Sequence, residues 1–213
     1  MSALGTTSIL AVLLVFGFVS GGLIDLGQDA LDAAKYPLIT GFYRIEMHVD
    51  RLDTQGKSHT GLSCDPIGGC DPKIKAFIDT ETPNRDFGGD SVPYDNYIVL
   101  YEGNDSEKVV PIGKTISRDI CGKGVRKVAM RVRAMDKDTV NDDKIDNYKC
   151  FITGENAPAA SADTAEWSAE IACPGEDRPT SKVFLKYRWY AIPESTCRPS
   201  SNGKGLFSGL LSR

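Results

Sequence analysis

Four aspartates gather within eight residues near the middle of the chain. They follow directly on a segment of alternating apolar and polar residues, at positions Asp136, Asp138, Asp142 and Asp143. Carboxylate oxygens are the ligands that Ca²⁺ takes in proteins, so D-x-D followed by D-D at a turn between two strands supplies several ligands to one ion. The spacing therefore predicts a calcium site in this loop.

A solvated turn explains the same acids without a metal. Asp and Asn suit turns because their side chains hydrogen-bond the local backbone. The EF-hand pattern D-x-[DN]-x-[DN]-G-x₅-E is absent from the sequence. Spacing alone leaves the calcium site and the solvated turn both open.

The residues that most enzymes need are scarce. The sequence holds two histidines, His48 and His59, and neither G-x-S-x-G nor H-E-x-x-H. His48 falls on the solvent-facing side of a strand pattern, and acids crowded at an exposed turn do not make a pocket that separates their pKa values. We expect no enzyme, with a secreted hydrolase as the less favoured alternative.

All six cysteines lie after an N-terminal apolar run. In an exported chain an even number of cysteines favours disulfides over free thiols. No C-x-x-C occurs, which argues against a zinc site. Nearness in sequence suggests one pair, Cys64 with Cys70, and the remaining pairings stay open. The full set of disulfide candidates is Cys64, Cys70, Cys121, Cys150, Cys173 and Cys197.

The N-terminal run, residues 9–19, is typical of a signal peptide. Small residues follow it, so we expect a signal peptide over residues 1–21 and a secreted, extracellular protein. At about eleven residues the run is too short to span a bilayer, and no later stretch is longer. The mature chain is therefore expected to have no transmembrane span. An uncleaved anchor is the alternative, since the run has no preceding Lys or Arg.

The acidic loop needs a strand to position it, and residues 125–134 supply one. Apolar and polar side chains alternate there with a period of two, which indicates a strand with one buried and one wet face. The predicted buried side is Val128, Met130, Val132 and Ala134, and the predicted solvent side is Lys127, Ala129, Arg131 and Arg133.

Other strand patterns occur over residues 41–52, 73–79, 97–101 and 183–190. The run 97–101 is continuously apolar, which predicts a strand buried on both faces. A chain of 213 residues with 21 Gly and 11 Pro between short β patterns fits one disulfide-bonded, all-β domain. We expect a short helical or linker segment over 22–40, the domain over 41–192 and a flexible, Gly- and Ser-rich tail over 193–213.

The net charge and one glycosylation sequon bear on the expected partners and modifications. The net charge is −4 and no basic run occurs, so nucleic acid is not an expected partner. Asn104, Asp105 and Ser106 form a glycosylation sequon after the 97–101 strand, which makes Asn104 a candidate glycan site in a secreted chain.

The order of motifs resembles a known family. A Gly-aromatic strand (GFYRIEMHVDRL) leads to a cysteine loop (GLSCDPIGGCD) and a short strand (KIKAFID), and VAMRVRAMDKDTVNDD, EWS and LKYRWY follow. This order resembles the N-terminal C2-like domain of Notch ligands of the Delta and Serrate/Jagged kind, over roughly residues 41–190. The resemblance implies a C2-like antiparallel β-sandwich of about eight strands and a Notch-like cell-surface receptor as partner.

The acidic loop is also similar to those of C2 domains in general, where two such loops meet at one end of the sandwich. That resemblance implies that Asp65 or Asp71 joins Asp136, Asp138 and Asp143 around Ca²⁺, which then touches anionic phospholipid headgroups. The loop here is one residue shorter than the commonest C2 form, which bears mainly on Asp143.

These observations together predict a secreted, non-catalytic binding module. In Notch ligands a cysteine-rich receptor-docking module, EGF repeats and a membrane span follow the C2-like domain. The sequence shows none of them before Arg213, so the expected role is recognition, with calcium-dependent phospholipid binding, and no transmission of force. A structural extracellular β-domain with no metal site is the alternative.

Overall fold

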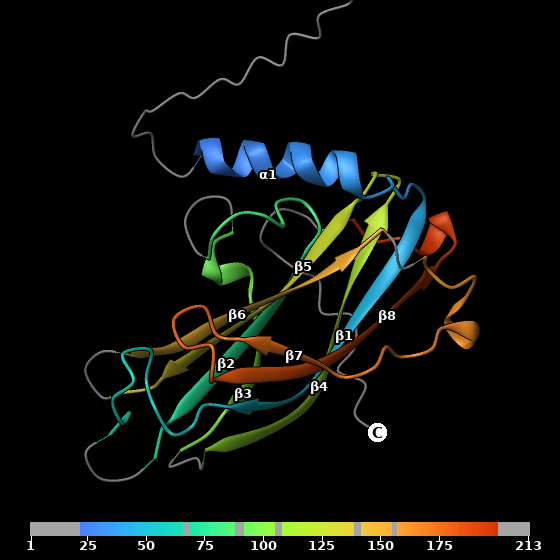
Figure 1. Ribbon diagram of the computed structural model, residues 1–213. Helices are drawn as coiled ribbons and strands as arrows, with labels where there is room; N and C mark the ends of the chain where they lie inside the picture. Colours follow the sequence, from blue (N-terminus) through green and yellow to red (C-terminus); the bar gives the residue numbers. More distant parts are fainter. Residues whose placement is uncertain are drawn as a thin grey trace, which may run out of the picture.

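The computed structural model describes residues 22–65, 69–87, 92–104, 108–138, 142–154 and 157–199, with the backbone alone for 22–26. Two four-stranded sheets face each other in the described part (Figure 1). The first has the order β4 (Val109–Cys121), β1 (Phe42–Asp53), β8 (Lys182–Ala191), β7 (Ile171–Pro174). The second has the order β3 (Ile98–Glu102), β2 (Pro72–Asp79), β5 (Lys127–Asp136), β6 (Asp143–Thr153).

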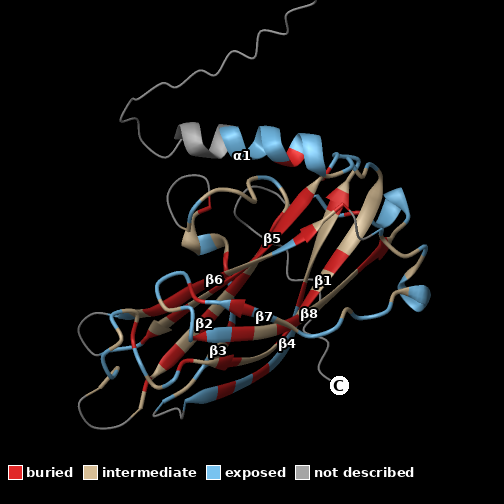
Figure 2. Ribbon diagram, in the orientation of Figure 1, coloured by how far each residue is buried: buried red, intermediate tan, exposed pale blue. Residues whose placement is uncertain are grey.

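Every pairing between these strands is antiparallel. The core lies between the sheets, where the inward side chains of β1 (Ile45, Met47 and Val49) are fully buried as their period-two spacing predicts. Burial alternates along β1 and β2 in Figure 2. The predicted all-β sandwich of about eight strands is confirmed.

Strand β5 differs from its prediction, because its outer face is covered too. Arg131 was expected to face water but is 0% exposed, and Lys127 is also buried. The segment between β2 and β3 crosses this face, so Arg131 pairs with buried Asp79 at 2.9 Å and donates to the backbone carbonyl of Arg85. Alternation in β5 showed which side chains point outward, but a covering loop decided their exposure.

Strand β3 is not the buried strand that its apolar run predicts. It lies at the edge of its sheet and pairs only with β2 among the described strands. Ile98 and Val99 are 36% and 47% exposed, and Leu100 is the buried residue of the strand. A continuous apolar run does not distinguish an edge strand from a central one, which explains the error.

A helix, α1 (Gly22–Lys35), precedes the sandwich at the place where helical spacing predicts one. Its apolar stripe does not pack on the domain as far as side chains are described, since Leu31 is 64% exposed. The contact is polar instead: buried Asp32 accepts from Lys127 Nζ at 3.1 Å and from Asn84 Nδ2 at 2.8 Å.

All six cysteines form disulfides, including the predicted Cys64–Cys70. The other two bonds are Cys121–Cys197 and Cys150–Cys173. The tail predicted to begin at residue 193 is therefore bonded to the domain as far as Cys197, after a short 3₁₀ helix, Glu194–Thr196.

Some predictions fall outside the described residues. These are the signal peptide, the tail from residue 200 onwards, and Asp105 and Ser106 of the sequon, although Asn104 itself is exposed. Among the helices that are described, none combines the length and apolar character needed to cross a bilayer.

Candidate metal centre

Two loops that are far apart in the sequence meet at one end of the sandwich (Figure 1). The β1–β2 loop follows Asp53, and the β5–β6 loop follows Asp136. Strand β2 begins where β5 ends, because Pro72 pairs with Asp136 in the sheet register. The backbone N–H of Lys137 donates to the carbonyl of Asp71 at 2.9 Å and extends this pairing into the loops. We call this the loop end.

Three predicted ligands come together at the loop end. Asp65, Asp136 and Asp138 each offer a carboxylate oxygen, and these oxygens all lie within 4.8 Å of one another. Oxygen ligands stand about 2.3–2.6 Å from Ca²⁺, so ligands on opposite sides of one ion are about 5 Å apart. The spacing of the three carboxylates therefore matches a single calcium ion.

Asp136 is the innermost member of the group, at 1% exposed. Its Oδ1 accepts the backbone N–H of Asp71 at 2.5 Å, which fixes the carboxylate against the start of β2. Its Oδ2 is buried and has no hydrogen-bond partner among the described residues. A buried carboxylate oxygen without a partner is costly, because it has lost its hydration. A cation at this point would supply the missing partner.

The charges at the loop end are under-compensated. Burial raises the pKa of Asp136 above its ordinary value despite the Asp71 N–H, and repulsion from Asp65, Asp138 and Asp71 adds to the rise. The pKa of Asp138 is also raised, by desolvation first and then by neighbouring aspartates that include Asp65 and Asp143. Like charges held this close favour protonation or a bound cation.

The Cys64–Cys70 disulfide positions Asp65. It closes a short loop, with a sequence separation of 6, directly beside Asp65 and two residues before β2. Asp65 is thereby kept near the start of β2, where Asp71 already contacts Asp136.

The two other predicted ligands lie outside the group of three. Asp71 contributes its backbone N–H to Asp136, and its charge raises the pKa of both Asp136 and Asp138. Asp143 pairs with Asp136 across the β5–β6 ladder, and its charge acts on Asp138. Both residues therefore shape the field at the centre, while the structure does not bring their carboxylates into the group.

The donor set fits a hard cation. Three carboxylates supply up to six oxygens, close to the roughly six to eight that Ca²⁺ takes, with water or backbone carbonyls as further ligands. Neither sulfur nor imidazole belongs to the group. The nearby Lys137 is already engaged, since its Nζ donates to Glu102 at 2.7 Å. If a metal binds, Asp65, Asp136 and Asp138 would hold it.

One residue of the loop end, Leu62, was not predicted from the sequence as part of the site. Leu62, in the β1–β2 loop three residues before Asp65, is 71% exposed. An isolated leucine within a Gly-, Ser- and Asp-rich segment was the available signal. It places an apolar side chain on the same loop as one of the acids.

Comparisons with known proteins place this fold in a family. Neither a protein-family model nor a curated protein sequence matches the chain. Among solved structures, a C2 domain protein from Ramazzottius varieornatus is 74% identical, with a TM-score of 0.77, over 79% of this chain and 100% of that one. This match supports the predicted C2-like fold and gives no support to the predicted Notch ligand domain.

More distant structures also match. A C2 domain of plant Extended Synaptotagmin 1 is 13% identical with a TM-score of 0.43, over 71% of this chain and 96% of that one. Human GIVD cytosolic phospholipase A2 is 11% identical with a TM-score of 0.49, over 72% of this chain and 17% of that one. The two distant matches carry no part of the family assignment. The 74% identity over the whole of the Ramazzottius varieornatus chain shows that this protein belongs to the C2 domain family.

Proposed function

We propose that this chain is a non-catalytic module that binds Ca²⁺ at the loop end and, with the ion in place, binds anionic phospholipid. The observation that carries the proposal is the convergence of Asp65, Asp136 and Asp138 within 4.8 Å around a buried Asp136 oxygen that lacks a partner among the described residues. Membership of the C2 domain family supports the same function.

Charge explains why lipid binding would require calcium. Without a cation the carboxylates at the loop end repel the phosphates and carboxylates of anionic lipids. A divalent ion offsets the negative charge and leaves open coordination positions that headgroup oxygens can fill. The ion is thus held by the protein carboxylates and also bridges them to the membrane surface.

Leu62 adds an apolar contribution. Its side chain is largely exposed, and it lies three residues before Asp65 on the loop that would approach the membrane. Transfer of a leucine from water to an apolar environment contributes roughly 1.5–3 kcal/mol when complete. Leu62→Ser is therefore expected to weaken vesicle binding while leaving calcium affinity unchanged.

We also propose that the protein acts outside the cell. Support comes from the three disulfides, which persist in oxidising compartments, and from the apolar run at residues 9–19. Extracellular calcium modules bind with Kd values on the order of 10⁻⁴–10⁻³ M. A centre with three carboxylates is expected to fall in this range.

Vesicle sedimentation tests the proposal. Phosphatidylcholine vesicles containing phosphatidylserine should carry the oxidised protein into the pellet with calcium and leave it in the supernatant with EGTA. Asp138→Asn should abolish this, while Asp163→Asn, an exposed aspartate on the short 3₁₀ helix Ala162–Thr164, should behave as wild type. Calcium binding without sedimentation would reject anionic phospholipid as the partner and would favour a protein receptor of the Notch type.

A further inference from the structure

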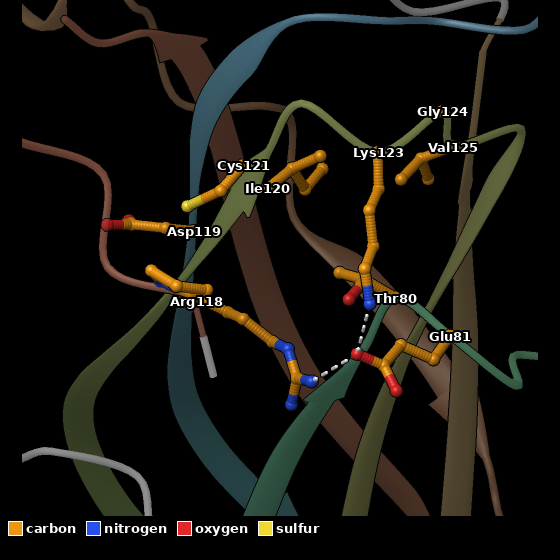
Figure 3. Close-up of a pocket in the computed structure, with 10 residues that line it drawn as sticks. Thr80, Glu81, Arg118, Asp119, Ile120, Cys121, Lys123, Gly124 and Val125 are labelled. Carbon is orange, nitrogen blue, oxygen red and sulfur yellow. Dashed lines mark ion pairs between the residues drawn. The ribbon is translucent and has the colours of Figure 1, made fainter. Parts of the chain in front are cut away.

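A second polar site lies at the opposite end of the sandwich, in a cavity of about 320 Å³ (Figure 3). Its walls come from the ends of β2 and β4, from the β4–β5 turn and from the C-terminal segment. The Cys121–Cys197 disulfide bonds the C-terminal segment to the end of β4. The charged lining residues are Glu81, Arg118, Asp119 and Lys123, and Thr80 and Pro199 also line the cavity.

Two cations in this cavity share one carboxylate through long contacts. Arg118 Nη2 lies 3.7 Å and Lys123 Nζ 3.5 Å from the same Oε1 of Glu81, and Figure 3 shows both side chains converging on it. Charge-assisted hydrogen bonds are typically about 2.7–2.9 Å long. Glu81 therefore satisfies neither cation fully.

Arg118 keeps an unused donor. Its Nε is buried and has no hydrogen-bond partner among the described residues. Nε and Nη2 lie on the same edge of the guanidinium, which is the fork that holds carboxylate and phosphate groups in bidentate fashion. Nη2 faces Glu81 across the cavity, and the buried Nε is the neighbouring donor on the same edge.

The second acid of the cavity does not offset this charge. Asp119 is committed to Arg44, whose Nε and Nη2 donate to its two oxygens at 2.7 and 3.0 Å. The backbone N–H of Arg198 occupies Oδ2 further. In Figure 3 the Asp119 carboxylate points away from Arg118 and Lys123. The cavity thus presents two cations against one acid.

We propose that this cavity binds a phosphate monoester group between Arg118 and Lys123. A phosphate oxygen pair would take the Nε and Nη2 donors of Arg118, a third oxygen would approach the Lys123 ammonium, and Glu81 would turn towards solvent. A phosphate monoester carries close to two negative charges at neutral pH, which match the two cations once Glu81 has left.

The position favours a soluble source for that phosphate. Arg118 lies nine positions along β4 from Val109, which pairs with Asp53 at the loop end. At about 3.3 Å a residue, roughly 30 Å separates the two sites. A membrane held at the loop end would not reach this cavity. The ligand is then a small soluble phosphate monoester, or else the headgroup of a second membrane.

Calorimetry with glycerol 3-phosphate in EDTA tests the proposal independently of the calcium centre. We expect saturable binding that Arg118→Gln weakens about tenfold or more, because it removes charged hydrogen bonds. Glu81→Gln should tighten binding several-fold by removing the competing carboxylate. Lys114→Gln, on an exposed lysine elsewhere on β4, and Asp138→Asn should leave it unchanged.

The second arm identifies the source of the phosphate. Phosphatidylcholine vesicles containing phosphatidic acid carry the same monoester on a membrane. Sedimentation in EDTA that follows the same order of variants would assign the site to a headgroup, and its absence alongside soluble binding would assign it to a free compound. No saturable heat with either wild type or Glu81→Gln, or an affinity that neither Arg118→Gln nor Glu81→Gln changes, would overturn the proposal.

Discussion

Single residues decide whether the loop end is a metal site or a solvated turn. An exposed acidic turn would leave each carboxylate hydrated, but Asp136 is 1% exposed, with one oxygen bonded to the Asp71 N–H and the other without a partner among the described residues. That arrangement raises the free energy of the metal-free protein. We therefore expect calcium to stabilise the fold as well as to bind.

The stabilisation by calcium is expected to depend on pH. Because the folded pKa values of Asp136 and Asp138 are raised, ionisation of these groups destabilises the metal-free fold above the unfolded pKa. Their unfavourable contribution fades as pH falls through the raised values. Calcium reverses the sign, since it holds the carboxylates ionised. The increase in Tm caused by calcium should shrink as the pH falls from neutral towards 3.8, the ordinary aspartate value.

Thermal unfolding with calcium and with EGTA over this pH range measures the effect. At a calcium concentration 100-fold above Kd, the expected stabilisation at neutral pH is about 2.7 kcal/mol. Asp163→Asn serves as the control, since Asp163 is an exposed aspartate outside the centre. An increase in Tm that is independent of pH would contradict the assignment of these carboxylates as ligands.

Arg131 is expected to contribute to the stability of the fold. This fully buried side chain pairs with Asp79, whose side chain is 3% exposed. Arg131→Met leaves the Asp79 charge buried and unpaired, which costs about 3–5 kcal/mol. Denaturant unfolding should show this loss, and the double variant with Asp79→Asn should recover part of it. Arg133→Met, at the next outward position of β5, should cost distinctly less, and equal losses would reject the explanation.

At the scale of elements, the disulfides separate stability from site geometry. Cys121–Cys197 spans 76 residues of sequence and Cys64–Cys70 spans 6. Loop-closure entropy predicts a loss of about 4 kcal/mol when the first is replaced by serines and about 2 kcal/mol for the second. Calcium affinity should show the reverse order, because only Cys64–Cys70 adjoins Asp65. Denaturant unfolding and calcium titration of the two double-serine variants measure both orders, and a larger affinity loss from the long-range bond would refute this division.

Elements also show how far the sequence predicts the fold. The inward faces of β1 and β5 follow from alternation alone, because a strand places every second side chain on one side. The outer face of β5 does not, since the partner of Arg131 lies 52 residues away and a crossing segment covers both. The edge position of β3 likewise depends on which strands pair.

At the scale of the whole molecule, the sequence predicts the acids but not their convergence. D-x-D at Asp136 and Asp138 indicated a calcium site, and the C2 resemblance pointed to either Asp65 or Asp71 as the contribution of the first loop. The register of Pro72 against Asp136 and the Cys64–Cys70 bond bring Asp65 into the group. The phosphate cavity left no sequence signal, because its walls come from segments far apart in the chain.

The two proposed sites lie at opposite ends of one sandwich, so a ligand bound at one would not block the other. Calcium and lipid would act at the loop end, and a phosphate monoester at the other. Both depend on the same rigid strands, yet each can be removed by a substitution that leaves the other intact.

Calcium titration of the oxidised protein by calorimetry is the most direct test of the central claim. We predict one saturable site with a Kd on the order of 10⁻⁴–10⁻³ M, lost in Asp138→Asn and retained in Asp163→Asn. The absence of saturable heat up to about 10 mM calcium, ten times the upper end of this Kd range, or heat that persists unchanged in Asp138→Asn, would show that the acids of the loop end form a solvated turn.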